Sequence, residues 1–238
     1  MNEKMYDAYR LRVSDYTCHD TLAPFAVLDI FQDIAGKHAN TYGMSFEELL
    51  NQNMIWVLLR VKYKVIKSIP LYSKVNAVTW PKKKGLVDFD REFQILSEEN
   101  EVMVNGISKW VVVNSQTRKI IPAKHIEYKA SIPEDSLFDK FDKIKDFDIT
   151  GLNRYDYNVE FCDLDHNGHV NNAKYAVMVL NALKLTKEEI IDEFEINFVH
   201  EVRGQKQISL FYYKEDNNYF IKAICEENTV FLCKLILK

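Results

Sequence analysis

The feature that most constrains the fold of this chain is an order of elements that occurs twice. Apolar periodicity predicts a strand, a polar turn, an apolar helix and several strands over residues 5–113, and again over residues 154–237. The period is far longer than that of a solenoid repeat. The pattern therefore indicates duplication of one domain.

The first half begins with a strand over Met5–Val13 and a long helix over Pro24–Tyr42, because Pro24 suits a first turn and the apolar residues that follow approximate helical spacing. A short capped helix is expected at Ser45–Leu50. Hairpin spacings then predict a mainly antiparallel sheet. Its strands are expected at Met54–Ile69, Lys74–Lys82, Leu86–Ser97 and Glu101–Val113.

The second half repeats this order with a strand over Arg154–Phe161, a helix over Asn172–Leu183 and a short helix over Lys187–Ile191. The later strands are expected at Glu193–His200, Gln205–Lys214, Tyr219–Glu226 and Thr229–Leu237. A helix that is apolar nearly all round must be covered on most faces, and a curved sheet does this. We therefore predict an α+β fold of two halves, each a long helix wrapped by an antiparallel β-sheet.

The predicted boundary between the halves lies where the alternation stops. Pro133 and a run of Asp and Lys residues mark residues 131–152 as a linker. We expect an N-terminal domain over residues 1–130 and a C-terminal domain over residues 153–238.

Composition excludes several classes of function. The net charge of −4 argues against nucleic-acid binding. The seven glycines form no phosphate-binding fingerprint. No apolar run is long enough for a membrane span, and the N-terminal residues lack the features of a signal or transit peptide. The four cysteines form no CxxC pair, which argues against a zinc site and favours reduced thiols in a cytoplasmic protein.

The polar loop of the second half joins a strand to a buried helix and contains Asp165, Asn167 and His169. Asn171 or Asn172 is expected to cap the helix. Backbone N–H groups, carboxylates and an imidazole thus meet at a helix N-terminus, a place that favours developing negative charge. Asp163 and Asn172 are expected to be structural, and His166 is expected to be a solvated loop residue.

The string from Asp165 to Tyr175, Asp-x-Asn-x-His-Val-Asn-Asn-x-x-Tyr, resembles the catalytic loop of the acyl-acyl carrier protein thioesterases of plant and bacterial type. Three further stretches are similar to this family: Phe31–Ala39, Ile55–Val61 and Ser108–Lys119. The matches span both halves of the chain. The resemblance implies a tandem, or double, hotdog fold.

The resemblance also implies a reaction and its residues. Members of the family hydrolyse the thioester of acyl-acyl carrier protein with no metal and no cofactor, and release free fatty acid. Their catalytic Asp, Asn, His and Glu match Asp165, Asn167, His169 and Glu201. Many plant-like members carry Cys directly after the Glu, where this chain has Val202. A mechanism of the papain type cannot operate from that position, and Cys162 is expected to be a small buried residue.

The first half has a corresponding loop at Asp15–Thr21 that lacks the Asn-x-His-Val-Asn-Asn string. We therefore expect one active site, in the C-terminal half. In the family the N-terminal half holds the acyl chain. The apolar residues that would line such a tunnel are Trp56, Leu58, Phe31 and Leu28, although their spacing also fits plain core.

The implied partner is acyl carrier protein, an acidic protein that binds transiently. Lys62, Lys64 and Lys67 on one strand, or Lys82–Lys84 at a hairpin tip, are candidates to attract it, and a solvated face is the alternative. A thioesterase acting on acyl-coenzyme A and a non-catalytic acyl-binding hotdog protein remain as other functions. The sequence allows a homodimer without requiring one.

Overall fold

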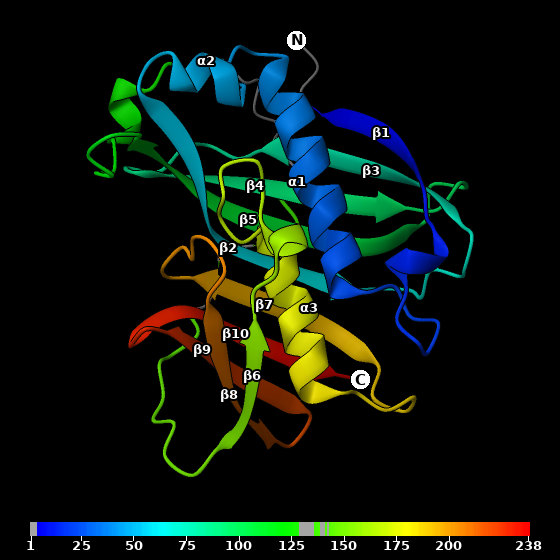
Figure 1. The fold of residues 1–238 in the computed structure, drawn as a ribbon. Coiled ribbons are helices and arrows are strands. Elements are labelled where there is room, and N and C mark those ends of the chain that lie inside the picture. The colour runs from blue at the N-terminus through cyan, green and yellow to red at the C-terminus, as the bar shows by residue number, and fades with distance from the viewer. Residues whose placement is uncertain (1–3, 129–135, 139–140, 142) are drawn as a thin grey trace. The chain divides into compact units, whose positions relative to one another are not determined.

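A computed structural model describes residues 4–128, 136–138, 141 and 143–238 (Figure 1). Its residues group into two compact units. The first unit comprises Met1–Val13 and Asp29–Phe141, and the second comprises Ser14–Leu28 and Asp142–Lys238. Of the expected linker, residues 131–135, 139–140 and 142 lie outside the described residues.

The first unit contains an antiparallel sheet in the order β1-β3-β4-β5-β2. Its strands are β1 (Met5–Arg10), β2 (Met54–Val65), β3 (Lys74–Pro81), β4 (Asp88–Leu96) and β5 (Val102–Asn114). Helix α1 (Pro24–Asn40) belongs to this unit from Asp29 onward, and Phe31 on it stacks on Phe93 of β4 with ring centroids 4.3 Å apart. A Cβ on Gly106 of β5 would clash with the Phe31 ring. Only glycine lets the helix approach the sheet this closely.

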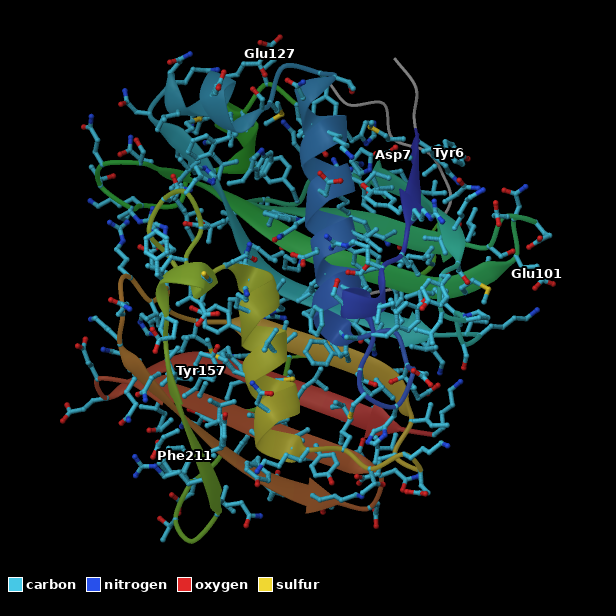
Figure 2. The ribbon with its side chains drawn as sticks, turned by 45° about the vertical axis from the view of Figure 1, so that its right-hand side comes forward. Tyr6, Asp7, Glu101, Glu127, Tyr157 and Phe211 are labelled. Atoms are coloured by element: carbon cyan, nitrogen blue, oxygen red, sulfur yellow. The ribbon has the colours of Figure 1, made fainter. Side chains whose placement is uncertain are left out.

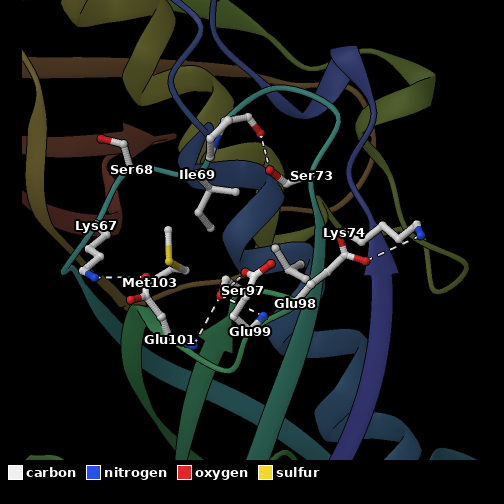
Figure 3. A pocket seen from close by; sticks show the side chains of 12 residues that line it. Lys67, Ser68, Ile69, Ser73, Lys74, Ser97, Glu98, Glu99, Glu101 and Met103 are labelled. Atoms are coloured by element: carbon white, nitrogen blue, oxygen red, sulfur yellow. Dashed lines mark hydrogen bonds and ion pairs between the residues drawn. The ribbon is translucent and has the colours of Figure 1, made fainter.

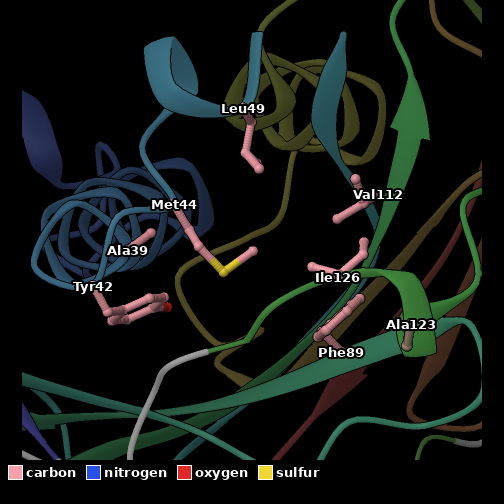
Figure 4. Close-up of a cluster of buried hydrophobic side chains, with 8 residues drawn as sticks. All are labelled: Ala39, Tyr42, Met44, Leu49, Phe89, Val112, Ala123 and Ile126. Carbon is pink, nitrogen blue, oxygen red and sulfur yellow. The ribbon is translucent and has the colours of Figure 1, made fainter. Parts of the chain in front are cut away.

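A second cluster of the same core lies beside α2 (Phe46–Leu50), and Figure 4 shows its side chains converging. Ser45 and Glu48 form the predicted capping box at the start of α2. The buried members of the cluster are Ala39, Tyr42, Met44, Leu49, Phe89, Val112, Ala123 and Ile126. Ala123 opens the short 3₁₀ turn η2 (Ala123–His125) that follows β5.

The second unit repeats the arrangement with an antiparallel sheet in the order β7-β10-β9-β8-β6. Its strands are β6 (Asn153–Asn158), β7 (Ile191–Phe198), β8 (Gln207–Glu215), β9 (Asn218–Cys225) and β10 (Asn228–Leu237). Helix α3 (Asn172–Leu183) packs on this sheet, where Tyr175 contacts Phe198 and Phe231 with centroid separations of 5.8 Å and 5.3 Å. Side chains such as Tyr157 of β6 appear in Figure 2.

The predicted α+β fold of two helix-and-sheet halves is confirmed, with several strands ending earlier than expected. The predicted helix at Lys187–Ile191 is wrong, because these residues form a turn and the start of β7. Pairing with β10 explains the difference, since Ile191 pairs with Leu237 and the Ile190 carbonyl accepts the Lys238 N–H at 2.9 Å. Among the described residues, no helix is both long and apolar enough to cross a bilayer.

Candidate active site

The polar loop of the second unit starts from a buried aspartate. After β6 the chain makes the 3₁₀ turn η3 (Phe161–Asp163), and the carboxylate of Asp163 accepts hydrogen bonds from the Tyr157 hydroxyl and the Glu160 N–H, each at 3.0 Å. Burial and this hydrogen bond raise the pKa of Tyr157 to about 12. The Asn171 N–H donates to the carbonyl of Asp163 at 2.9 Å. Asp163 thus has the structural role expected of it.

Asp165 organises the turn that follows. Its Oδ1 accepts the N–H groups of Asn167 at 2.8 Å and His169 at 3.0 Å, and its own N–H donates to the His169 carbonyl at 2.7 Å. Gly168 adopts a positive φ of 75°, which a side chain would disfavour. Oδ2 of Asp165 has no hydrogen-bond partner in the part of the chain that the structure describes. One carboxylate oxygen therefore holds the loop and the other is left for a reactant.

His169 lies between two carboxylates. Its Nδ1 is 3.9 Å from Oδ1 of Asp165, and its Nε2 is 3.3 Å from Oε2 of Glu201. The second distance is within hydrogen-bond range, yet Nε2 makes no aligned hydrogen bond and is itself buried. The two side chains are therefore neighbours without a directed hydrogen bond. The ring edge is thus held near an acid and keeps its hydrogen-bonding capacity.

Glu201 is positioned by the segment that follows β7. Arg203 forms an isolated bridge with His169, and the Val170 N–H donates to the Val202 carbonyl at 2.9 Å. These bonds fasten the loop to the Glu201 segment and bring His169 and Glu201 together. The Glu201 side chain is 41% exposed, so solvent reaches its carboxylate.

Arg203 is a charged neighbour that the sequence analysis did not select. Its Nη2 donates to Oε1 of Glu201 at 3.3 Å. The signal for it was available, because residues two apart in an extended segment project to the same face. The guanidinium holds one oxygen of Glu201 and leaves the other beside His169.

The four predicted catalytic residues are only partly brought together. Asp165, His169 and Glu201 are adjacent, whereas Asn167 is exposed and contributes only its backbone N–H to Asp165. His166 is exposed, as expected. Among the described residues no group of three or more His, Cys, Asp or Glu side chains is arranged to hold a metal ion.

Two expectations about neighbouring residues are resolved. Cys162 is exposed, so its predicted role as a small buried residue is wrong, because η3 turns it away from the core. Asn171 caps α3 by accepting the Ala173 N–H at 2.9 Å. Val202, at the position of the family's cysteine, is buried at 4% exposure. Burial raises the pKa of the Tyr175 hydroxyl, which also has a backbone hydrogen bond with Val202.

The residues proposed to line an acyl tunnel are packed in cores. Leu28, Phe31 and Leu58 are buried, and the Trp56 indole N–H donates to the Met44 carbonyl at 3.2 Å. None of these four residues lines the pocket beside Lys67 or the pocket beside Thr17.

The lysines proposed to attract a carrier are mostly engaged. Lys82 donates to Glu92 at 3.0 Å, and Lys84 donates to the carbonyls of Ala123 and Ile126 at 3.0 and 3.1 Å. Lys83 alone of that tip is exposed. These contacts make the hairpin tip largely structural.

Lys67 lies beyond the end of β2, so the prediction that it shares a strand face with Lys62 and Lys64 is wrong. It pairs with Glu101 at 3.0 Å, at the rim of a pocket of about 470 Å³ in the first unit. Figure 3 shows this pair and the Lys74–Glu98 pair, 3.5 Å apart, across the rim. Glu99 also lines this pocket, so two lysines face three glutamates and the lining is net acidic. Ser68 is among the remaining lining residues.

The chain contains a second loop with the backbone of the first. We call residues Asp163–Asn171 the Asp165 loop, and residues Asp15–Ala23 the Thr17 loop. Each follows a 3₁₀ turn, η3 or η1 (Val13–Asp15), and each precedes a long helix. In the Thr17 loop, Thr17, His19 and Thr21 occupy the places of Asp165, Asn167 and His169.

Comparison with known proteins places the chain in a family. Residues 2–128 match the acyl-ACP thioesterase N-terminal domain, and residues 148–233 match the acyl-ACP thioesterase C-terminal domain. A chloroplastic acyl-[acyl-carrier-protein] hydrolase of Cuphea viscosissima is 28% identical over 187 residues, which cover 71% of this chain and 44% of the relative. A chloroplastic oleoyl-acyl carrier protein thioesterase of Arabidopsis thaliana is 27% identical over 198 residues, covering 73% and 51%. The chain spans about half the length of the curated relatives it matches.

Solved structures share the fold. An acyl-ACP thioesterase from Bacteroides thetaiotaomicron superposes with a TM-score of 0.89 at 21% identity, covering 99% of this chain and 98% of the other. The 12:0-ACP thioesterase from Umbellularia californica superposes with a TM-score of 0.83 at 16% identity, covering 100% and 98%. These likenesses confirm the predicted double hotdog fold. With both of its halves matched by the two domain families, the chain belongs to the acyl-ACP thioesterase family.

Proposed function

We propose that this chain hydrolyses the thioester of acyl-acyl carrier protein, releases free fatty acid and so ends chain elongation. The observation that carries the proposal is the placement of the His169 imidazole between the carboxylates of Asp165 and Glu201. Thioester hydrolysis needs a base or nucleophile and a group that stabilises the oxyanion. The proposed reaction uses these side chains and water, with no cofactor.

Asp165 is the proposed base or nucleophile, because its Oδ2 has no protein partner among the described residues. As a base it removes a proton from water while the water oxygen bonds to the thioester carbon. The carbon–sulfur bond then breaks, and the departing sulfur takes the proton back. As a nucleophile, Oδ2 itself bonds to the carbon and displaces the sulfur as a thiolate. Water then hydrolyses the acyl-aspartate to the fatty acid and the free carboxylate, and the proton released from water goes to the thiolate.

His169 and Glu201 are the proposed stabilisers of this reaction. Nε2 of His169 is buried, lacks an aligned partner and lies beside Glu201, so it can donate to the oxygen that becomes negative. Glu201, held through one oxygen by Arg203, is proposed to orient the ring with its other oxygen. Asn167 is proposed to orient the reacting water or carboxylate after its exposed amide turns toward the substrate.

The proposed division of labour gives the acyl chain to the N-terminal domain, residues 1–130, and the chemistry to the C-terminal domain, residues 153–238, joined by a linker over residues 131–152. Support for the first part is the apolar character of Phe31, Leu58, Trp56 and Leu28. Because these side chains are now packed, binding must open a channel among Phe31, Leu58 and Trp56 of the first unit. Substituting a larger residue at Leu58 should then shorten the preferred acyl chain.

A steady-state assay with carrier-bound and coenzyme A-bound acyl groups of several lengths tests the proposal. We expect a higher kcat/KM for the carrier-bound series. A preference for coenzyme A thioesters would move the chain to the first alternative, an acyl-coenzyme A thioesterase. Tight acyl binding without turnover of either series would support a non-catalytic acyl-binding protein and overturn the proposal.

We also propose a cytoplasmic location, supported by the four cysteines, which are all free and fit a reducing compartment. The curated relatives named above are chloroplastic, so subcellular fractionation is the informative measurement. For assembly, the proposal admits a single chain or a homodimer, which sedimentation velocity distinguishes. The carrier protein is the proposed transient partner.

A further inference from the structure

A pocket of about 660 Å³ lies in the second unit, away from the residues assigned to catalysis. Its volume is in the range of small-molecule sites. One wall is the Thr17 loop, and the other is formed by Tyr155, the C-terminal end of α3 and the turn after it. The lining residues used below are Thr17, Cys18, His19, Thr21, Asn181, Lys184, Leu185, Thr186, Lys187 and Glu189.

The pocket presents net positive charge. Glu189 is its one acidic lining residue, and that carboxylate accepts from Lys214 at 2.7 Å and from Tyr219 at 2.8 Å. The Lys214 contact and the Thr186 N–H lower the pKa of Glu189 to about 2, so its charge is offset from outside the pocket. Lys184 and Lys187 make no ion pair among the described residues. The carbonyl groups at the C-terminal end of α3 contribute only about half a negative charge. The two lysine charges outweigh it, so the pocket favours an anionic ligand.

The remaining lining groups suit a chain of amides. Thr17 and Thr21 hydrogen-bond each other through their hydroxyls at 2.8 Å, and each hydroxyl retains a further bonding site. Asn181 adds an exposed amide. Nε2 of His19 lies 3.1 Å from the Leu185 carbonyl, which fixes the ring as part of the wall. Apolar surface comes from Leu180, Leu185 and Ile191. An anionic group followed by amides and short aliphatic segments matches this combination.

The loop itself indicates binding without reaction. The Thr17 loop has the same backbone hydrogen bonds as the Asp165 loop, which is proposed to face the thioester. In place of the Asp165 carboxylate and the His169 imidazole, however, the Thr17 loop has threonines. We propose that this pocket binds a phosphopantetheine group without hydrolysing its thioester. The choice of ligand rests on the proposed function, because carrier protein and coenzyme A both bear this group.

Alkylation of Cys18 reports on the pocket directly. Cys18 is exposed and lines it, and Cys162 is exposed beside the Asp165 loop, so one digest analysed by mass spectrometry follows both sites. The probes are S-methyl phosphopantetheine, S-methyl coenzyme A and carrier protein with an S-methylated arm, because a free thiol would consume the reagent. At about ten times Kd, about nine-tenths of the pockets are filled, so Cys18 alkylation should slow about tenfold.

Three substitutions test the role of charge. Lys184→Gln and Lys187→Gln should each raise the probe concentration needed for protection about tenfold, because each removes a charge-assisted contact. Lys145→Gln, an exposed lysine of the same unit that does not line the pocket, should leave it unchanged. Equal weakening by all three would overturn the site, since it would reduce the effect to net charge.

The other probes complete the test. If S-methyl coenzyme A protects Cys18 and the carrier does not, coenzyme A is the source of the phosphopantetheine group. If the carrier protects Cys18 as well, the carrier is also a source. Either result supports the pocket. Equal protection by inorganic phosphate or by decanoate overturns the phosphopantetheine assignment. Absent protection of Cys18 while the enzyme hydrolyses its substrate refutes this inference and leaves the proposed function intact. Protection of Cys18 in a protein that hydrolyses nothing refutes the proposed function and keeps the pocket.

Discussion

The Thr17 loop and the Asp165 loop have the same backbone hydrogen bonds and different side chains. The N–H of Thr17 donates to the Thr21 carbonyl at 2.8 Å, and the N–H of Asp165 donates to the His169 carbonyl at 2.7 Å. The Ala23 N–H donates to Asp15 and the Asn171 N–H donates to Asp163, each at 2.9 Å. In both loops the fourth residue, counted from Thr17 or from Asp165, has a positive φ: 58° at Asp20 and 75° at Gly168.

The strand ends show the same correspondence. The N–H groups of Val199 and His200 both donate to the Val230 carbonyl, at 2.8 and 3.1 Å. Those of Ile66 and Lys67 both donate to the Met103 carbonyl, at the same two distances. Ser68 therefore stands in the first unit where Glu201 stands in the second.

The difference separates what the fold requires from what the proposed chemistry requires. The hotdog half needs a buried aspartate after its first strand and a closed turn before its helix, and both halves have them at Asp15 and Asp163. It does not need the carboxylate, imidazole and glutamate, which only the second half carries. Residues shared by both loops should thus affect stability, and residues found in one loop should affect rate.

The largest expected effect is on turnover. Asp165→Ala should lower kcat by at least about a hundredfold, because losing an acid–base group typically costs 10²–10⁴ in rate. KM should stay within a few-fold. Asn167→Ala and His169→Ala should lower the same parameter, and combining either with Asp165→Ala should be much less than additive. Steady-state kinetics on folded variants measure this.

His166→Ala is the matched control, because this exposed neighbour is in the same loop. It should have nearly normal kcat. A dead His166→Ala enzyme, or a folded Asp165→Ala enzyme with normal turnover, would show that the wrong face of the loop had been assigned to the chemistry.

The next effect is on stability. Asp163→Ala removes the acceptor of the Tyr157 hydroxyl and the Glu160 N–H, so we expect a loss of about 2–3 kcal/mol. For a chain of this length the melting temperature should fall by about 4–12 °C. Asp15→Ala, at the corresponding buried place, should also destabilise. Thermal melting checks both, and a change in only one of them would break the equivalence of the loops.

A smaller change follows from copying the Thr17 loop into the Asp165 loop. Thr17 Oγ1 accepts the His19 N–H at 3.2 Å, as Asp165 Oδ1 accepts the Asn167 N–H. Asp165→Thr should therefore lose about 1 kcal/mol less unfolding free energy than Asp165→Ala. Its melting temperature should accordingly lie closer to that of the wild type. Both variants should be equally inactive. Residual turnover in Asp165→Thr alone would mean that a hydroxyl suffices.

The sequence predicts those parts of the fold that depend on neighbours along the chain. Helix α3 begins and ends where its apolar run and the Asn171 cap indicate. The helix expected at Lys187–Ile191 fails because the backbone of Ile190 and Ile191 pairs with Leu237 and Lys238, partners that no local pattern reveals. For the site, Asp165 and His169 stand out in one loop. Glu201 could be named only through the family resemblance, since nothing local indicates that it lies against His169.

A still smaller effect concerns salt. If exposed basic residues such as Lys83 steer an acidic carrier, raising the ionic strength should increase KM for the carrier-bound substrate by about threefold or more. KM for a small thioester should change less than about twofold. Equal responses of the two substrates would remove the argument for an electrostatic docking surface, whichever lysines compose it.

The smallest expected effect is that of the thiol beside the Asp165 loop. Cys162 is exposed in the middle of η3, and no described contact joins its sulfur to His169. Val202 occupies the position of the family's cysteine and is buried, so neither residue supplies a thiolate to the thioester. Cys162→Ala should therefore keep most of the wild-type kcat, and alkylation of the native enzyme should leave turnover largely intact. Cys225 and Cys233, whose thiol pKa values are raised by burial, provide the unreactive reference in the same alkylation experiment. A folded Cys162→Ala enzyme that lost about a thousandfold in kcat, the scale of an essential group, would replace the carboxylate mechanism with a thiol one.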